Sequence, residues 1–282
     1  MQRIFWILVV SLAALWSAAA SAQTPSPFPY WANSAGVVMM PMAGPPKEWQ
    51  TELGGGIAVL PTYEGSHTYH WTPAPEIDIR YYDLAFISSG DGIGVNLLHG
   101  QTYRAGVAIS YDAGREHNYG SRLAGTGNVD PTPELKLFAQ AYFKPFGDAL
   151  PLPIAVTVDA RQAAFGHQGM IGDIGLYMPI AGNKTFDIFI GPSVTFADRE
   201  YMQSYFGISA PHAAPQSIFA PYEAHGGVKD ASFGVSADYR FTDHWALHGD
   251  VAFERLMASA GNSPIVQEKS QLGSALTLGY SF

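Results

Sequence analysis

Residues 230–241 form the stretch DASFGVSADYRF, and its pattern decides the fold. Every second residue is apolar, and the residues between are charged, hydroxylated or glycine. Successive side chains of a β-strand point to opposite faces, so this alternation predicts a strand with one apolar and one polar face. The last twelve residues, 271–282 (QLGSALTLGYSF), alternate in the same way and end on the aromatic Phe282.

Two kinds of β-protein show this alternation. A soluble sandwich or barrel buries the apolar face, whereas a transmembrane barrel turns it toward lipid and keeps polar groups inside. The polar face here is rich in small residues, and charged residues make up only 14% of the chain, against about 25% in typical soluble domains. Aromatic residues cluster at strand ends, as in the interfacial girdles of membrane barrels. The pattern therefore favours an all-β, antiparallel up-and-down transmembrane barrel over a soluble β-protein.

Twelve segments carry strand-like patterning. They are 49–60, 74–82, 83–89, 91–99, 102–113, 133–145, 152–164, 169–180, 184–197, 229–241, 244–257 and 270–282. Short and long connections alternate along the chain, as expected of short periplasmic turns and longer external loops. With twelve strands every long loop falls on one side, and the last strand closes the barrel; ten strands is the alternative.

The N-terminal segment MQRIFWILVVSLAALWSAAASAQ has one positive charge, an apolar run and an A-x-A site, which predicts a secretory signal cleaved after Ala22. Residues 23–48 are rich in proline and predict a periplasmic extension, which leaves 49–282 for the barrel. This organisation predicts a monomer in the outer membrane of a Gram-negative bacterium, with the outer-membrane lipid and the barrel assembly machinery as partners.

Several function classes are disfavoured. The formal charge of −9 argues against nucleic-acid binding, and the absence of cysteine excludes disulfides, thiolate metal sites and a cysteine nucleophile. No G-x-S-x-G motif is present, and we predict neither enzyme activity nor a cofactor. His67 and His70 would point to opposite faces of an extended chain, and His244 and His248 would lie about 13 Å apart on one strand. We therefore predict no metal site.

Five motifs carry a family resemblance. They are PTYEG (61–65), LAGTGNVD (123–130), ADREYMQSYFGIS (197–209), GVKDASFG (227–234) and ASAGNSPIV (258–266). Through them, residues from about Leu53 to Phe282 resemble the MipA/OmpV family of outer-membrane proteins. The resemblance implies a scaffold or adaptor for murein-synthesising and murein-degrading enzymes, with a lytic transglycosylase and a penicillin-binding protein as partners. It also leaves open a porin-like small-solute channel or a surface-exposed adhesin.

One candidate site is the external loop after the ninth strand. It has four large side chains, and the SP pair of the last loop is a second candidate: Tyr201, Met202, Tyr205, Phe206, Ser263 and Pro264. Exposed aromatic clusters favour partners, so these residues are either a contact surface or a plug that folds into the barrel mouth. The plug is the preferred interpretation.

A second candidate set lies on the polar strand faces that are expected to line the lumen. Its members are Arg80, Arg104, Arg161, Asp238, Arg240 and Asp250. They either pair with one another and hold the interior together, or line a narrow permeation path, because twelve strands fall between the filled eight-stranded barrels and the open sixteen-stranded ones.

The terminal aromatic residue gives the first testable prediction. Tyr280 and Phe282 lie on the apolar face of the last strand and resemble the aromatic signal by which outer-membrane barrels are recognised for assembly. We predict that Phe282→Ser lowers the amount of assembled barrel while secretion continues. Heat-modifiable gel mobility of outer-membrane fractions measures this, and an unchanged folded yield would contradict it.

Overall fold

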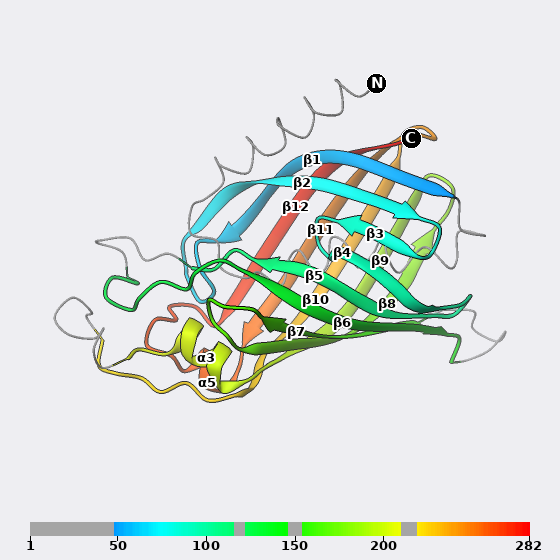
Figure 1. Cartoon of the computed structure of the whole chain (residues 1–282). Coiled ribbons are helices and arrows are strands. Elements are labelled where there is room, and N and C mark those ends of the chain that lie inside the picture. The colour runs from blue at the N-terminus through cyan, green and yellow to red at the C-terminus, as the bar shows by residue number, and fades with distance from the viewer. Residues whose placement is uncertain (1–47, 116–121, 146–153, 210–218) are drawn as a thin grey trace, which may run out of the picture.

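The computed structural model describes residues 48–115, 122–145, 154–209 and 219–282, which form a closed barrel (Figure 1). Its twelve strands are β1 (Trp49–Pro61), β2 (Tyr69–Tyr81), β3 (Ala85–Ser88), β4 (Gly92–His99), β5 (Tyr103–Asp112), β6 (Thr132–Phe143), β7 (Ile154–Ala163), β8 (Met170–Gly182), β9 (Phe186–Ala197), β10 (Gly227–Arg240), β11 (Trp245–Leu256) and β12 (Ser270–Ser281). The predicted class and strand number are confirmed. The predicted signal and nearly all of the predicted extension lie outside the described residues.

Every strand pairs antiparallel with its neighbours in sequence, and β1 pairs with β12 to close the ring. The closing register runs from Glu52 opposite Ser281 to Val59 opposite Ser274. At the end of this seam the Phe282 amide donates to the Thr51 carbonyl over 3.0 Å. Each described strand therefore has a hydrogen-bonded neighbour on both sides, as a sheet placed in lipid requires, although the short β3 pairs with only Asp78–Tyr81 of the longer β2.

The alternating faces lie as the membrane-barrel pattern requires. On β10 the apolar residues Phe233 and Val235 are exposed on the outside, whereas the hydroxyls of Ser232 and Ser236 are buried within. The same division on β12 exposes Leu276 and Leu278. A soluble barrel would have the opposite arrangement, so the exterior is suited to lipid and the interior to polar groups.

Exposed aromatic side chains gather near both ends of the strands. At the end that carries both barrel termini they are Trp49, Tyr82, Tyr103, Phe143, Phe186, Tyr239, Phe241, Trp245 and Phe282, and at the other end Tyr69, Trp71, Tyr111, Phe165, Phe196 and Phe253. Tyr280 contacts both Trp245 and Phe282, with ring centroids 4.9 Å apart in each case. These two girdles match the two membrane–water interfaces.

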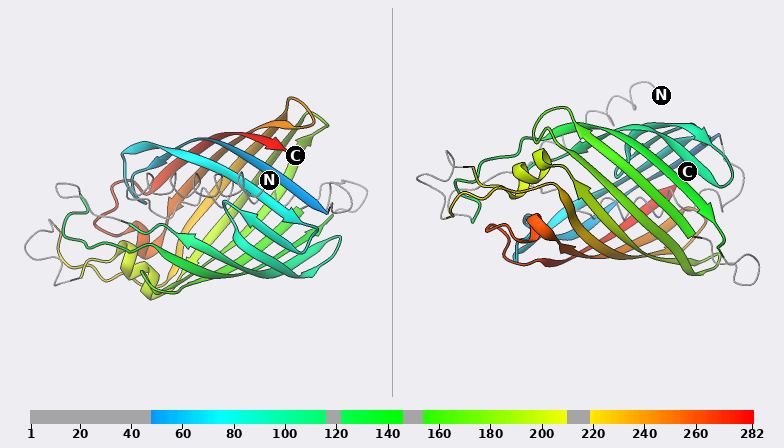
Figure 2. Two further views of the ribbon diagram at one scale, coloured as in Figure 1. Left: turned by 45° about the horizontal axis from the view of Figure 1, so that its top comes forward. Right: turned by 90° about the horizontal axis from the view of Figure 1, so that it is seen from below.

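The two ends of the barrel differ in their connections (Figure 2). At the short-turn end, β2–β3, β4–β5, β8–β9 and β10–β11 are joined by three or four residues. At the loop end, the connections 113–131, 198–226 and 257–269 are long. Among the described residues, no helix is both long enough and apolar enough to cross a membrane.

Three local details differ from the sequence prediction. The strand predicted over 74–82 begins five residues earlier, at Tyr69. The segment predicted as a strand over 83–89 contains only the four residues of β3, because Tyr82 takes a positive φ of 47° and the turn extends to Leu84. The long connections at the loop end, predicted as irregular external loops, contain helices α3 (Arg199–Phe206) and α5 (Ala258–Gly261).

Two glycines on β1 let the seam strands approach each other. A Cβ on Gly56 would lie 1.9 Å from the Leu276 carbonyl oxygen of β12, and one on Gly54 would lie 2.3 Å from that of Leu278. A Cβ on the intervening Gly55 meets nothing closer than 3.8 Å. Only glycine therefore fits at positions 54 and 56 of the seam.

We predict that Gly56→Ala lowers the fraction of folded barrel, because the added methyl group forces apart the strand pair that closes the ring. Gly55→Ala is the matched control and should fold like the parent protein. Refolding yield measured by heat-modifiable mobility tests this, and equal yields for the two variants would contradict it.

Candidate functional site: the loop core and the polar chain beneath it

The α3 helix is built from local signals in the connection between β9 and β10. Asp198 precedes it in an extended conformation, and its carboxylate accepts the Tyr201 amide over 2.8 Å, which caps the first turn. Arg115 donates to the Ser204 and Tyr205 carbonyls at the other end, where a cation offsets the helix dipole. Burial lowers the pKa of Arg115 to about 10, so the guanidinium stays charged at neutral pH.

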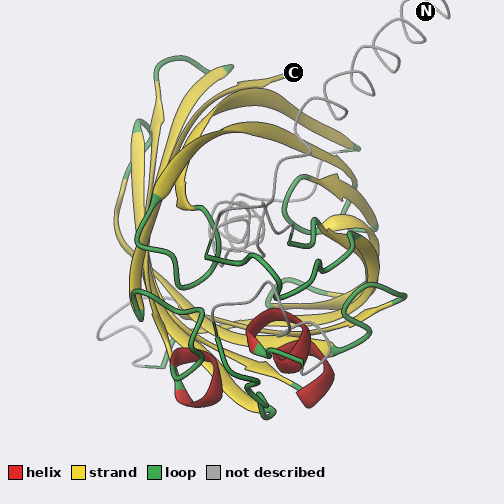
Figure 3. Ribbon diagram, turned by 90° about the vertical axis from the view of Figure 1, so that its left-hand side faces the viewer, coloured by secondary structure: helices red, strands yellow, loops and turns green. Residues whose placement is uncertain are grey.

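The predicted loop residues lie inside this helix's packed face. Tyr201, Met202, Tyr205 and Phe206 are all at most 2% exposed. They pack with residues of the neighbouring loops and strand ends: Val129, Ile171, Ala197, Ala224, Leu256 and Ala260. We name these ten residues the loop core; Figure 3 shows its helices gathered on one side of the loop end. A surface that contacts partners would need these side chains exposed.

The second predicted loop element joins the first. The Ser263 hydroxyl is buried and donates to the Phe206 carbonyl over 2.5 Å. The Pro264 carbonyl, half-buried, accepts from Arg122 over 3.3 Å. The structure thus brings together the motifs that contain Phe206 and Ser263, which are about 60 residues apart in sequence. Their contact stabilises the loop end.

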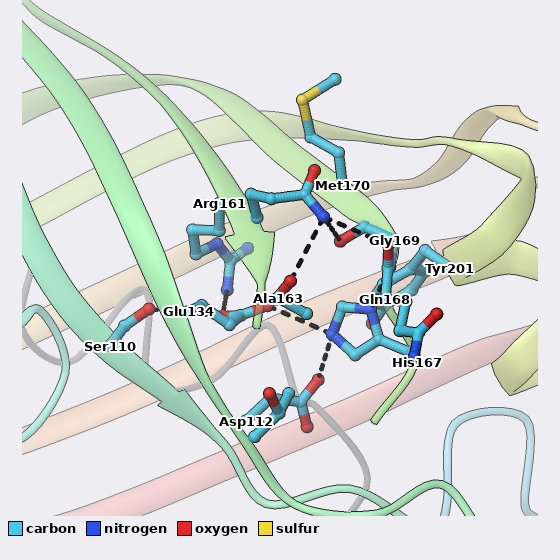
Figure 4. A network of polar contacts seen from close by, with 12 residues as sticks. Ser110, Asp112, Glu134, Arg161, Ala163, His167, Gln168, Gly169, Met170 and Tyr201 are labelled. Atoms are coloured by element: carbon cyan, nitrogen blue, oxygen red, sulfur yellow. Dashed lines mark hydrogen bonds and ion pairs between the residues drawn. The ribbon is translucent and has the colours of Figure 1, made fainter. Parts of the chain in front are cut away.

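Beneath the loop core, a continuous series of polar contacts crosses the lumen wall from β5 to β10. We name it the polar chain, and its members in order of contact are Asp112, His167, Glu134, Arg161, Asp173, Thr195, Asp230 and Lys229. Figure 4 shows its first half, with Asp112 and Glu134 both facing the same nitrogen of the His167 ring. Arg161 lies 2.6 Å from Asp173 and 3.9 Å from Glu134.

The histidine at the start of the polar chain acts as a hydrogen-bond donor. His167 Nε2 lies 3.2 Å from Asp112 and 3.3 Å from Glu134. Burial opposes protonation of the ring, but the hydrogen bonds and charges of the two carboxylates raise the pKa of His167 to about 9. The charged ring would carry a proton on Nδ1 as well. The Gly169 amide opposes that proton, because its N–H points at Nδ1 over 3.1 Å.

The same three groups are close enough to suggest a metal centre, since their ligand atoms lie within 4.8 Å of one another. The tautomer of His167 argues against a metal centre. Nδ1 accepts a hydrogen bond in the neutral ring, so Nε2 carries the proton there, and Nε2 also carries one in the charged ring. The nitrogen that faces both carboxylates therefore has no free lone pair for a metal.

At the other end of the polar chain, Lys229 is surrounded by three carboxylates. Its Nζ lies 2.6 Å from Glu64, 2.8 Å from Asp230 and 3.6 Å from Glu254, and all four groups are buried. Burial raises the pKa of Glu64 to about 7 although Lys229 opposes the shift. This ion pair ties the connection between β1 and β2 to the barrel wall.

The predicted lumen charges also have partners on the wall. Arg80 binds both oxygens of Asp78, Arg104 pairs with Asp83, and Arg240 pairs with Asp187. Asp250 accepts from Ser236, and Asp238 lies 2.7 Å from His248 Nδ1. The structure therefore distributes the predicted set over separate pairs instead of collecting it into one centre.

Sequence reasoning missed His167, Glu134, Lys229 and Glu64. Strand pairing brings His167 next to Glu134, and the arrangement of the ring brings Glu64 next to Lys229, although each pair is far apart in sequence. One signal was available for α3: Tyr201 and Tyr205, like Met202 and Phe206, are four residues apart, which is helical spacing for a buried face.

Two tyrosines of α3 differ in one hydrogen bond. Tyr205 donates to both oxygens of Asp112 over 2.8 Å, whereas the buried Tyr201 hydroxyl has no hydrogen-bond partner among the described residues. Burial, followed by the negative charge of Asp112, raises the pKa of Tyr205 well above its usual range, so the phenol remains a donor.

We predict that Tyr205→Phe destabilises the loop core by about 1–3 kcal/mol, because the buried Asp112 loses one of its hydrogen-bond donors. Tyr201→Phe is the matched control and should be neutral or slightly stabilising, since it removes an unpaired hydroxyl. Hydrogen exchange of residues 198–206 in the detergent-solubilised barrel measures the difference. Equal protection in the two variants would overturn this account of the site.

Solved barrels of similar shape exist at low identity. The outer-membrane channel COG4313 of Pseudomonas putida F1 is 10% identical with a TM-score of 0.45, and the alignment covers 85% of this chain and 97% of that one. The translocator domain of the autotransporter NalP of Neisseria meningitidis is 10% identical with a TM-score of 0.41, over 88% and 95% of the two chains. At these values neither likeness bears on function.

The sequence comparisons are more specific. No curated protein matches the chain. A family model does match, over residues 53–282, which include all the strands from the middle of β1 to the end of the chain. This is nearly the span over which the motifs of the sequence show their resemblance, so that prediction is confirmed. The chain belongs to the MipA family, described as MltA-interacting protein MipA.

Proposed function

We propose that the chain is a non-enzymatic outer-membrane barrel that serves as a scaffold for murein-synthesising and murein-degrading enzymes. One observation carries this proposal. Buried contacts of the loop core and the polar chain tie external loops to the barrel wall. Such an interior suits a barrel that keeps a fixed shape. The family's description, MltA-interacting protein, supports a partner of the murein-degrading kind.

The scaffold role limits where the partner binds. Murein enzymes act in the periplasm, and by the rule for membrane barrels the short-turn end faces that side. The described connections at this end, 82–84, 100–102, 183–185 and 241–244, are tight turns with little surface. We therefore assign the contact to the proline-rich segment 23–48, which precedes β1 at the same end.

We predict that deletion of residues 24–46 from the mature chain abolishes capture of a lytic transglycosylase or a penicillin-binding protein. The detergent-solubilised barrel is used as bait in an envelope extract, and the captured enzymes are identified by mass spectrometry. Tyr205→Phe is the control, because it alters the loop end alone and should capture normally. Capture that survives the deletion would refute the assigned contact.

A small-solute channel is the second candidate, and the charge of the lumen favours it. Arg161, Lys229 and His248 each face three carboxylates. A cavity of about 50 Å³ in the lumen has a mixed lining, with the cations of Arg80, Arg104 and Lys136 and the carboxylates of Asp91 and Asp159. If the lumen conducts, the surplus of carboxylates makes it prefer cations. Planar-bilayer recording separates the candidates: the scaffold predicts silence, and discrete cation-selective openings favour the channel. An adhesin gains no support from the buried loop aromatics.

A further inference from the structure

A second cluster of metal-ligating side chains lies in the lumen near the short-turn end. Glu52 of β1, Glu76 of β2 and His248 of β11 place their ligand atoms within 4.8 Å of one another. His248 Nε2 lies 2.9 Å from the nearer Glu52 oxygen and 3.6 Å from that of Glu76. Metal–ligand distances of about 2.0–2.2 Å require ligand atoms roughly 3.0–3.5 Å apart, so small side-chain shifts suffice.

The ring of His248 is oriented as a metal ligand requires. Its Nδ1 lies 2.7 Å from an Asp238 carboxylate oxygen, which can only accept when ionised. The Nδ1 nitrogen is therefore the donor, and in the neutral ring the Nε2 lone pair faces Glu52 and Glu76. A carboxylate that holds the far nitrogen of the ring is the usual outer partner of a metal-bound histidine. His167 has the opposite arrangement, since its Nδ1 accepts.

One carboxylate oxygen of this cluster lacks a hydrogen bond. Glu76 Oε2 is buried and has no hydrogen-bond partner among the described residues, whereas His248 Nε2 faces the Glu52 oxygen 2.9 Å away. The cluster is also rich in negative charge. Across the described part of the chain, His248 is the only basic side chain that pairs with Glu52, Glu76 or Asp238. A bound cation would satisfy both the unpaired Glu76 oxygen and the excess charge.

The strand between Glu52 and His248 leaves room for an ion. Gly279 of β12 lies between them, and a Cβ at this position would be 2.7 Å from the Glu52 oxygen and 3.1 Å from His248 Nε2. Any other residue would therefore push into the ligand atoms. On β11, by contrast, a Cβ on Gly249 would make only ordinary contacts, the nearest at 3.6 Å.

We propose that Glu52, Glu76 and His248 form a binding site for a first-row divalent transition-metal ion, with Asp238 orienting the histidine and Gly279 providing the space. One imidazole and two carboxylates are ligands that Zn²⁺ accepts, and three protein ligands leave a position for water. The imidazole favours such an ion over Ca²⁺ or Mg²⁺, which prefer oxygen ligands.

The position of the site gives the ion a structural consequence. Its ligands come from β1, β2 and β11, and β12 lies between β1 and β11 in the ring. A bound ion would therefore bridge the N-terminal and C-terminal strands across the closing seam. Because it binds only the closed barrel, it should raise the temperature of unfolding.

The test measures Zn²⁺ binding to the tag-free, detergent-refolded full mature chain after treatment with a chelator. We expect one Zn²⁺ per barrel and a higher unfolding temperature with Zn²⁺ but not with Ca²⁺. His248→Gln and Glu76→Gln should abolish binding, whereas Asp238→Asn, which keeps all three ligands, should weaken it about 10–100-fold. His244→Gln is the control, because its ring stacks on Tyr280 and belongs to no such cluster.

A glycine pair supplies a test that leaves the ligands intact. Gly279→Ala should lose Zn²⁺ binding and Gly249→Ala should retain it, each examined only in the heat-modifiable, folded fraction. If a ligand variant fails to fold, the glycine pair and Asp238→Asn decide. The proposal is overturned if the parent barrel binds no Zn²⁺, or if the folded ligand variants bind it as the parent does.

Discussion

The pairing of every backbone donor and acceptor in an apolar surrounding is the constraint on which this structure depends. Lipid offers no hydrogen bonds, so an open sheet edge would cost several kcal/mol for each unpaired group. The chain meets the constraint by pairing β1 with β12, and two glycines on β1 permit the close approach of the strands. Once the seam is closed, the outward face can be apolar along the whole ring.

Closure also determines what the interior can hold. The inward side chains of neighbouring strands face a common space, and many of them are charged. Burying a charge without a partner is costly, and such groups pair or bind ions. Near the loop end they form the polar chain around Arg161 and Lys229, while near the short-turn end the cluster around His248 has more carboxylates than one histidine can balance.

At the loop end, beyond the membrane, the side chains are likewise arranged so that apolar groups are buried and polar groups are paired. Tyr201, Met202, Tyr205 and Phe206 would be an exposed apolar surface in an irregular loop, and the capped helix α3 turns them inward. Tyr205 then links this apolar core to the polar chain through Asp112. The external motifs that identify the family therefore serve the architecture, which is why the proposed partner contact is assigned to the opposite end.

The sequence by itself determined the barrel class, the number of strands and the outward direction of the apolar face, because alternation with period two is a local property that each strand repeats. The same local reasoning identified candidate loop and lumen residues but not their partners. Only the tertiary structure decided that His167 meets Asp112 and Glu134, and that His248 meets Glu52 and Glu76. Those neighbours are set by strand register and by closure of the ring, and neither is encoded in any single stretch of the chain.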